Sequence, residues 1–187
     1  HKAIRRQRQM CIRDSFKDLF EEELKKGNDI LYIGFSSGLS TTYNSGAMAA
    51  GELAEKYPDR KLITIDSLCA STGFGLLLYL AVLKKESGAT LEQTADYVRE
   101  RIPHICHWFT VDDLVYLKRG GRISGAAALV GSVLGIKPIL RGDETGHIVS
   151  CGKVRGNKKA YAELADYFDK RALDKTCLLY TSDAADE

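Results

Sequence analysis

The chain has 187 residues, of which 44% are hydrophobic and 28% are charged, a composition that suits a packed globular fold. Its 27 Lys and Arg residues nearly balance 25 Asp and Glu residues, so the formal charge of +2 does not favour nucleic acid or an acidic membrane as a partner. The apolar runs are too short for an integral membrane segment, and five scattered cysteines form neither a zinc motif nor a disulfide framework, so we expect a cytoplasmic protein without cofactor or metal.

The two ends of the sequence differ in character from the rest. Residues 1–15 contain the stretch RRQRQMCIRDS, residues 177–187 read CLLYTSDAADE, and both resemble translated sequencing-adapter fragments. We therefore expect 1–15 and 177–187 to be non-native segments. The alternative is a basic disordered arm at one end and a frayed acidic tail at the other.

The first part of the chain predicts a parallel α/β layer. A helix from Phe16 ends near Gly27, where a glycine suits the C-terminal cap. The continuous apolar run 30–35 predicts a strand covered on both faces. A helix over 41–57 and a second buried strand over 61–65 complete a βαβ unit.

The pattern continues with a strongly apolar helix over 73–87 and a helix from 90 to about 102, which opens with a Thr90–Gln93 capping box. Beyond Pro103 the order of elements changes. The predicted elements there are a strand over 104–111, a short helix over 112–121, a small-residue helix over 123–135, a hairpin over 136–156 that turns near 144–146, and a last helix over 158–173. We expect this last helix to bury a face formed by Tyr161, Leu164, Ala165 and Phe168.

The fold class is therefore α/β, divided near Pro103. We expect residues 16–103 to form a partial first α/β domain with a parallel sheet. Residues 104–176 are expected to form a partial second α/β domain with a mixed or antiparallel sheet.

Two hydroxyl-rich loops follow the predicted parallel strands, where ligands of α/β sheets gather. The first carries five hydroxyls within seven positions, namely Ser36, Ser37, Ser40, Thr41 and Thr42. The second is the stretch DSLCASTGFG, residues 66–75. Helix capping explains any one of these residues, and Ser40 or Thr41 and Ser71 or Thr72 are the candidates for it. Five hydroxyls exceed what capping needs, so the first loop predicts a cradle for a carboxylate or phosphate.

The same letters permit an alternative of a different class. Gly34-Phe35-Ser36-Ser37-Gly38 fits the G-x-S-x-G motif of a serine hydrolase that acts on acyl esters, with Asp66 or Asp112 and His147 as nominal partners. That motif requires a helix directly after the nucleophile, and the helix here is predicted to begin too late. A phosphate- or nucleotide-binding module is a third possibility, but no P-loop or dinucleotide motif supports it.

The stretch KRGGRIS, residues 118–124, is a second dense feature. Lys118 and Arg119 suit the C-terminal end of a helix that glycines close. Arg122 lies beyond that cap, so we favour it as a contact for phosphate or for an acidic partner.

Taken together, SSGLSTTYNSG, TIDSLCASTGFG, FTVDDLVYLKRGGRIS and LGIKPIL followed by GKVRGNKKA resemble the DegV family of bacterial fatty-acid-binding proteins, over residues 16–173. The resemblance implies two α/β domains that hold one long-chain fatty acid between them, in a chain truncated at both ends. It also implies a non-catalytic protein that presents the fatty acid to a fatty acid kinase.

The resemblance implies particular site residues as well. The serine that binds the carboxylate in the family maps to Ser40, and we assign the same task to Thr42 and Ser37. Thr41 stands where the family has glycine. Apolar stretches over 74–83 and 126–134 are candidate walls for the acyl slot, although most of their residues are expected in the ordinary core.

Overall fold

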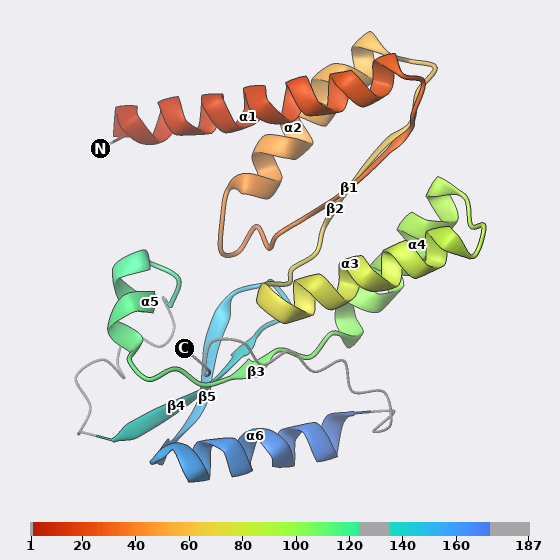
Figure 1. Ribbon diagram of the computed structural model, residues 1–187. Helices are drawn as coiled ribbons and strands as arrows, with labels where there is room; N and C mark the ends of the chain where they lie inside the picture. The colour runs from red at the N-terminus through yellow and green to blue at the C-terminus, as the bar shows by residue number, and fades with distance from the viewer. Residues whose placement is uncertain (1, 124–134, 173–187) are drawn as a thin grey trace. The chain divides into compact units, whose positions relative to one another are not determined.

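The computed structural model describes residues 2–123 and 135–172, with side chains from residue 11 onward (Figure 1). The chain divides into two compact units, His1–Ile105 and Cys106–Glu187. The described part of the first unit contains a sheet of two parallel strands, and that of the second contains a sheet of three antiparallel strands. This is the α/β architecture that the sequence predicts.

The first unit contains the predicted βαβ arrangement. Its elements are α1 (Lys2–Lys25), β1 (Ile30–Gly34), α2 (Thr42–Lys56), β2 (Leu62–Asp66), α3 (Ser71–Glu86), α4 (Leu91–Arg101) and the short 3-10 helix η1 (Ile102–His104). The register of β1 and β2 runs from Ile30 opposite Leu62 to Gly34 opposite Asp66. The two strands therefore end at the same level, and the loops that follow them emerge side by side.

The two faces of this sheet pack into different apolar clusters. Ile30 and Tyr32 face the cluster formed with α1 and α2, whereas Leu31 and Ile33 face the cluster formed with α3 and α4. Side chains alternate between the two faces of a strand, so a strand covered on both sides must be apolar at every position. The continuous apolar run of β1 is explained in this way.

Helix α1 begins earlier than predicted. It starts at Lys2 rather than at Phe16, so residues 2–15 continue the same helix and do not form a disordered arm. Arg13 and Lys17 both pair with Glu52 of α2, at 3.3 and 2.8 Å. Most residues of this stretch favour helix, and the pair of its Arg13 with Glu52 ties its end to α2.

Helices α3 and α4 follow the prediction more closely. The capping box of α4 is confirmed, because Thr90 Oγ1 accepts from the Gln93 N–H and Gln93 Oε1 accepts from the Thr90 N–H, at 3.2 and 2.9 Å. Helix α3 begins at Ser71, slightly before the predicted start. Only Leu77 and Ala81 of α3 are buried, so the expectation that most of its apolar residues lie in the core is wrong for Tyr79, Val82 and Leu83, which are exposed.

The second unit contains the predicted hairpin. Its described elements are β3 (Trp108–Phe109), α5 (Leu114–Gly120), β4 (Ile136–Gly142), β5 (Ile148–Arg155) and α6 (Asn157–Arg171), with the sheet order β3-β4-β5. The predicted strand over 104–111 is wrong for most of its length, because Pro103 lies in the short helix η1 and only Trp108 and Phe109 pair with β4. The predicted helix over 123–135 and the slot wall over 126–134 lie almost entirely outside the described residues.

Helix α6 presents a different face from the one predicted. Tyr161 and Phe168 are 57% and 40% exposed, so the predicted face is largely open. The buried residue is Ala160, and Tyr167 stacks on Trp108 with ring centroids 3.8 Å apart. Aromatic stacking with β3 therefore sets the rotation of the helix about its axis.

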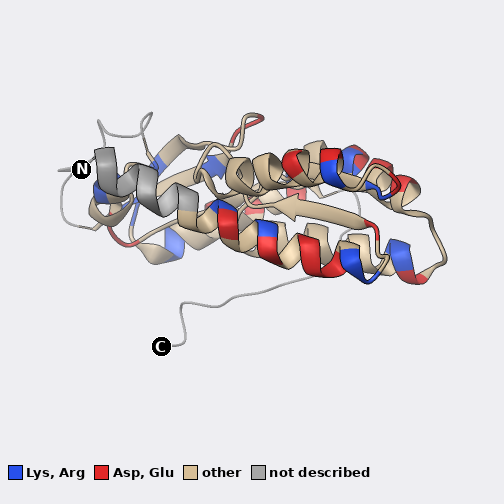
Figure 2. Ribbon diagram, turned by 90° about the horizontal axis from the view of Figure 1, so that it is seen from above, with Lys and Arg blue, Asp and Glu red and all other residues tan. Residues whose placement is uncertain are grey.

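Acidic and basic residues are interspersed along the helices (Figure 2). Many of them form pairs on the surface, such as Lys26 with Glu22 at 2.8 Å, and such exposed pairs contribute little stability. Within residues 2–123 and 135–172, no helix is both long and apolar enough to cross a membrane. The same residues contain no group of histidine, cysteine and acidic side chains that is arranged to hold a metal ion.

Candidate functional site

Two loops meet at the carboxyl ends of β1 and β2. We call residues 35–41 the serine loop and residues 67–70 the second loop. The Ser36 N–H donates to the Cys69 carbonyl at 3.0 Å, and the Ser67 N–H donates to the Gly34 carbonyl at 3.1 Å. The first bond joins the two loops, and the second joins the second loop to the end of β1. Both lie at the edge of the sheet where α/β proteins place their ligands.

A buried serine lies at the centre of each loop. Ser36 and Ser67 both have 0% exposure. Ser36 Oγ accepts from the Gly38 N–H at 3.2 Å, and Ser67 Oγ accepts from the Cys69 N–H at 3.1 Å. Both hydroxyls therefore satisfy backbone groups inside the loops, as buried polar groups must.

The burial of Ser36 is incompatible with the hydrolase alternative. A nucleophile elbow exposes its serine on a sharp turn and starts its helix at once, whereas α2 here begins only at Thr42. Asp66 binds backbone N–H groups of the two loops, and His147 bonds Thr145 in the turn between β4 and β5, at 2.8 Å. Neither residue takes the role that a catalytic triad requires.

Asp66 bridges the two loops through a single oxygen. Its Oδ1 accepts from the Ser37 N–H and from the Leu68 N–H, each at 3.1 Å. Leu68 has a φ of 52°, in the left-handed region that non-glycine residues seldom adopt, and Ser71 has a φ of 47°. The second loop therefore has an unusual backbone that Asp66 helps to hold in place.

Ser40 and Thr42 form a hydroxyl pair at the start of α2. Their Oγ and Oγ1 atoms are 2.8 Å apart, and the Thr42 N–H also donates to Ser40 Oγ at 3.2 Å. Both residues are half-buried. The two hydroxyls carry two protons, and their mutual bond uses one of them. Whichever hydroxyl donates in that bond, one O–H remains to donate to a ligand.

The other predicted site residues of the first unit differ in exposure. Ser37 is half-buried on the same loop, and its backbone N–H is used by Asp66. Thr41 is exposed and is the N-cap of α2, but its side chain makes no capping bond, so the capping oxygen is that of Ser40. Ala70 is the N-cap of α3, so the predicted capping by Ser71 or Thr72 is wrong.

Tyr32 is a residue of this region that sequence reasoning missed. Its ring stacks on Tyr43, with centroids 6.0 Å apart, and it fills the space above two glycines. A Cβ at Gly34 would lie 2.9 Å from the Tyr32 hydroxyl oxygen, and a Cβ at Gly46 would lie 2.5 Å from its Cε1. Tyr32 therefore fixes the first turns of α2 against the end of β1. The only sequence signal was a glycine at each of these two positions.

Burial also shapes the titration of groups near the loops. Burial, with smaller contributions from Tyr43 and Asp66, raises the pKa of Tyr32 to about 12. Burial, together with the charge of Asp66, raises the pKa of the Cys69 thiol to about 12. Cys69 therefore stays a neutral thiol at physiological pH and is a structural residue.

Arg122 lies in the second unit, after α5. Gly121 closes this helix in the left-handed conformation with a φ of 74°. The Arg122 N–H donates to the Leu117 carbonyl at 3.0 Å, and its guanidinium donates to the Gly120 carbonyl. The structure thus gives Arg122 a capping interaction, the role that the sequence assigned to Lys118 and Arg119.

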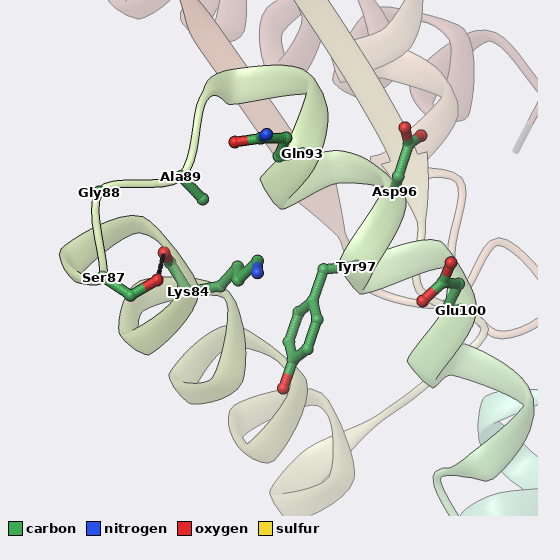
Figure 3. A pocket seen from close by; sticks show the side chains of 8 residues that line it. All are labelled: Lys84, Ser87, Gly88, Ala89, Gln93, Asp96, Tyr97 and Glu100. Carbon is green, nitrogen blue, oxygen red and sulfur yellow. Dashed lines mark hydrogen bonds between the residues drawn. The ribbon is translucent and has the colours of Figure 1, made fainter.

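An open groove of about 450 Å³ lies between α3 and α4 (Figure 3). Its lining residues are Lys84, Ser87, Gly88, Ala89, Gln93, Asp96, Tyr97 and Glu100. The Lys84 ammonium lies 5.5 Å from the centre of the Tyr97 ring, and the Arg101 guanidinium lies 4.4 Å from it. This polar lining of mixed charge does not suit an acyl chain, and its contacts are those that join two helices.

The fold and the loops define an α/β protein with a hydroxyl cradle at the carboxyl end of a parallel sheet. A family model described as uncharacterised protein, DegV family, matches residues 6–187. The chain therefore belongs to the DegV family, and the resemblance seen in the sequence is confirmed.

Individual relatives agree with this assignment. A DegV domain-containing protein of Clostridium perfringens is 42% identical over 92% of this chain and 60% of its own length. A DegV family protein from Eubacterium eligens, solved loaded with heptadecanoic acid, has a TM-score of 0.74 at 26% identity, covering 85% of this chain and 56% of that one. A fatty-acid-binding DegV family protein from Thermus thermophilus has a TM-score of 0.73 at 32% identity, covering 84% and 54%. The chain thus spans little more than half the length of these proteins.

Proposed function

We propose that the chain binds a long-chain fatty acid and holds its carboxylate at the serine loop, with Ser40, Thr42 and Ser37 as the contacts. The observation that carries this proposal is the Ser40–Thr42 pair, which leaves one O–H donor at the first turn of α2. The solved relatives described as loaded with heptadecanoic acid or as fatty-acid-binding support the choice of ligand.

The electrostatics of the loop suit a single carboxylate. The N–H groups of Tyr43 and Asn44 lie in the first turn of α2, where they have no acceptor within the helix. The helix dipole adds a partial positive charge at the same end. A carboxylate that accepts one hydroxyl and one or two N–H groups is well satisfied there without a lysine or arginine in the loop.

Apolar side chains beside the cradle suit the start of an acyl chain. Phe35 and Phe74 meet edge to face with ring centroids 6.1 Å apart, and both are half-buried, as is Leu39. Each methylene that such surfaces remove from water contributes about 0.8 kcal/mol. A long chain therefore supplies most of the affinity, while the hydroxyls fix the position of its head group.

Under this proposal, the chain is a fatty-acid carrier without catalytic residues of its own. Its partner is a fatty acid kinase that phosphorylates the presented carboxylate, and the use of ATP by such a kinase places their encounter in the cytoplasm. The exposed guanidinium of Arg122 is the candidate contact for a phosphate or for an acidic surface of the kinase.

The experiment that tests the function is extraction and mass spectrometry of the lipid that copurifies with this chain. We expect a long-chain fatty acid in an amount approaching one molecule per chain. Recovery of a nucleotide, or binding of a fatty acid methyl ester as tightly as the free acid, would contradict the proposed carboxylate cradle.

A further inference from the structure

Asp66 is an acidic side chain at the candidate site, since β2 ends with it and its Oδ1 accepts from the Ser37 N–H of the serine loop. Acidic side chains repel carboxylates, so its place directly beside a proposed carboxylate cradle needs a physical reason. Asp66 is half-buried, and its Oδ1 is committed to two backbone N–H groups at 3.1 Å. One of these N–H groups belongs to the serine loop and the other to the second loop.

These two bonds link the segments that determine where Ser40 lies. Ser37 is followed by a tight turn in which the N–H groups of Leu39 and Ser40 both donate to the Ser36 carbonyl at 3.1 Å. The position of Ser40 therefore depends on the orientation of the peptide between Ser36 and Ser37. Asp66 binds the N–H of that same peptide.

The backbone of the second loop gives a reason for Asp66 to hold the two loops together. Leu68 has a φ of 52°, a conformation that costs a bulky residue free energy, and its N–H is the other donor to Asp66. The Ser36 N–H donates to the Cys69 carbonyl, so a relaxed second loop would move the serine loop with it.

On these grounds we propose that Asp66 is a positioning residue, whose Oδ1 keeps the serine loop in its ligand-binding conformation by holding the Ser37 and Leu68 N–H groups together. The proposal rests on the proposed function of the serine loop. The conformation of the serine loop then depends on the position of this one oxygen atom and not on the negative charge of Asp66.

Two substitutions separate the effect of the position of Oδ1 from the effect of the negative charge of Asp66. Asp66→Asn removes the charge but keeps an oxygen where Oδ1 lies. Asp66→Glu keeps the charge but moves the oxygens by one methylene. A loop that is in its binding conformation for only a tenth to a fifth of the time binds about five- to tenfold more weakly. We therefore expect Asp66→Glu to raise the Kd for stearic acid about five- to tenfold, and Asp66→Asn to bind as tightly as the wild type or more tightly.

A second measurement keeps the proposal testable whether or not the chain binds fatty acid. Amide hydrogen exchange at Ser37 and Leu68 should speed up in Asp66→Glu and stay slow in Asp66→Asn, while the core amide of Leu53 is unchanged in both. Asp59→Glu, in the exposed turn before β2, is the matched control and should alter neither measurement.

The outcomes distinguish the two proposals. The positioning role alone would be overturned in two cases. In the first, the wild type binds stearic acid and Asp66→Glu binds it with the same Kd. In the second, Asp66→Asn binds stearic acid as weakly as Asp66→Glu. A wild-type chain that binds no fatty acid, but shows the expected exchange pattern, would overturn the proposed function and leave the role of Asp66 in the loop intact.

Discussion

The packing of Tyr32 between two glycines makes a prediction about α2. Gly46 lies inside this helix, where a glycine normally costs about 0.5–1 kcal/mol relative to alanine. The added Cβ of Gly46→Ala would lie 2.5 Å from Tyr32 Cε1, far inside van der Waals contact. The ring cannot easily move away, because Phe16, Phe20 and Tyr43 surround it with centroids 5.1, 5.6 and 6.0 Å distant.

Overpacking of this kind costs about 1–3 kcal/mol, which exceeds the gain in helix propensity. We therefore expect Gly46→Ala to lower the free energy of unfolding by about 1–2 kcal/mol. Gly51 supplies a matched control in the same helix, since a Cβ there meets nothing within 4 Å. Gly51→Ala should raise the free energy of unfolding by about 0.5–1 kcal/mol.

Urea denaturation measures both variants, with an unchanged slope showing that the same surface unfolds. Combining Gly46→Ala with Tyr32→Leu removes the ring that the new methyl group meets, so in that background Gly46→Ala should no longer destabilise the chain. If Gly46→Ala stabilised the wild-type chain as much as Gly51→Ala does, the proposed contact between Tyr32 and α2 would be refuted.

Two further predictions concern charged residues. Hydrogen bonds from Lys56 and then Tyr57 lower the pKa of Glu21 from its ordinary 4.5 to about 2. Glu21 thus binds a proton less readily in the folded state, so its contribution to the free energy of unfolding is present above pH 4.5 and is lost as the pH falls toward 2. In acid denaturation, Glu21→Gln should lose less stability than the wild type over that window. An unchanged profile would contradict the stabilising role of Glu21. Arg122→Ala should slow acyl-phosphate formation by a cognate kinase more than it weakens fatty-acid binding. An equal loss of both would indicate a structural role, such as its bond to the Gly120 carbonyl.

Local patterns predicted much of the fold. The βαβ unit, the capping box at Thr90 and the hairpin over 136–156 depend on residues close in the sequence, and all three are present. Long-range contacts account for the errors. The pairing of Trp108 with Tyr167 rotates α6 away from its predicted apolar face, and no periodicity within the helix reports a partner in a distant strand.

Local sequence patterns also predicted only part of the candidate site. The count of hydroxyls located the serine loop, but it could not tell which serine is buried. Ser36 turned out to lie inside the loop and Ser40 at the helix start, because the backbone bonds to Cys69 and the turn after Ser36 decide their exposure. The bridge made by Asp66 joins residues that are 29 positions apart, a contact that no single-sequence pattern reports.

The binding role of the Ser40–Thr42 pair is the central claim, and the affinity of one double variant tests it most directly. Ser40→Ala together with Thr42→Val removes the donor hydroxyl whichever residue supplies it. A hydrogen bond to a charged group contributes about 1.5–3 kcal/mol, so the Kd for stearic acid should rise about 10- to 150-fold. Thr41→Val, which removes the neighbouring exposed hydroxyl, is the control and should leave the Kd unchanged. A double variant that binds stearic acid as tightly as the wild type would show that the carboxylate is held elsewhere.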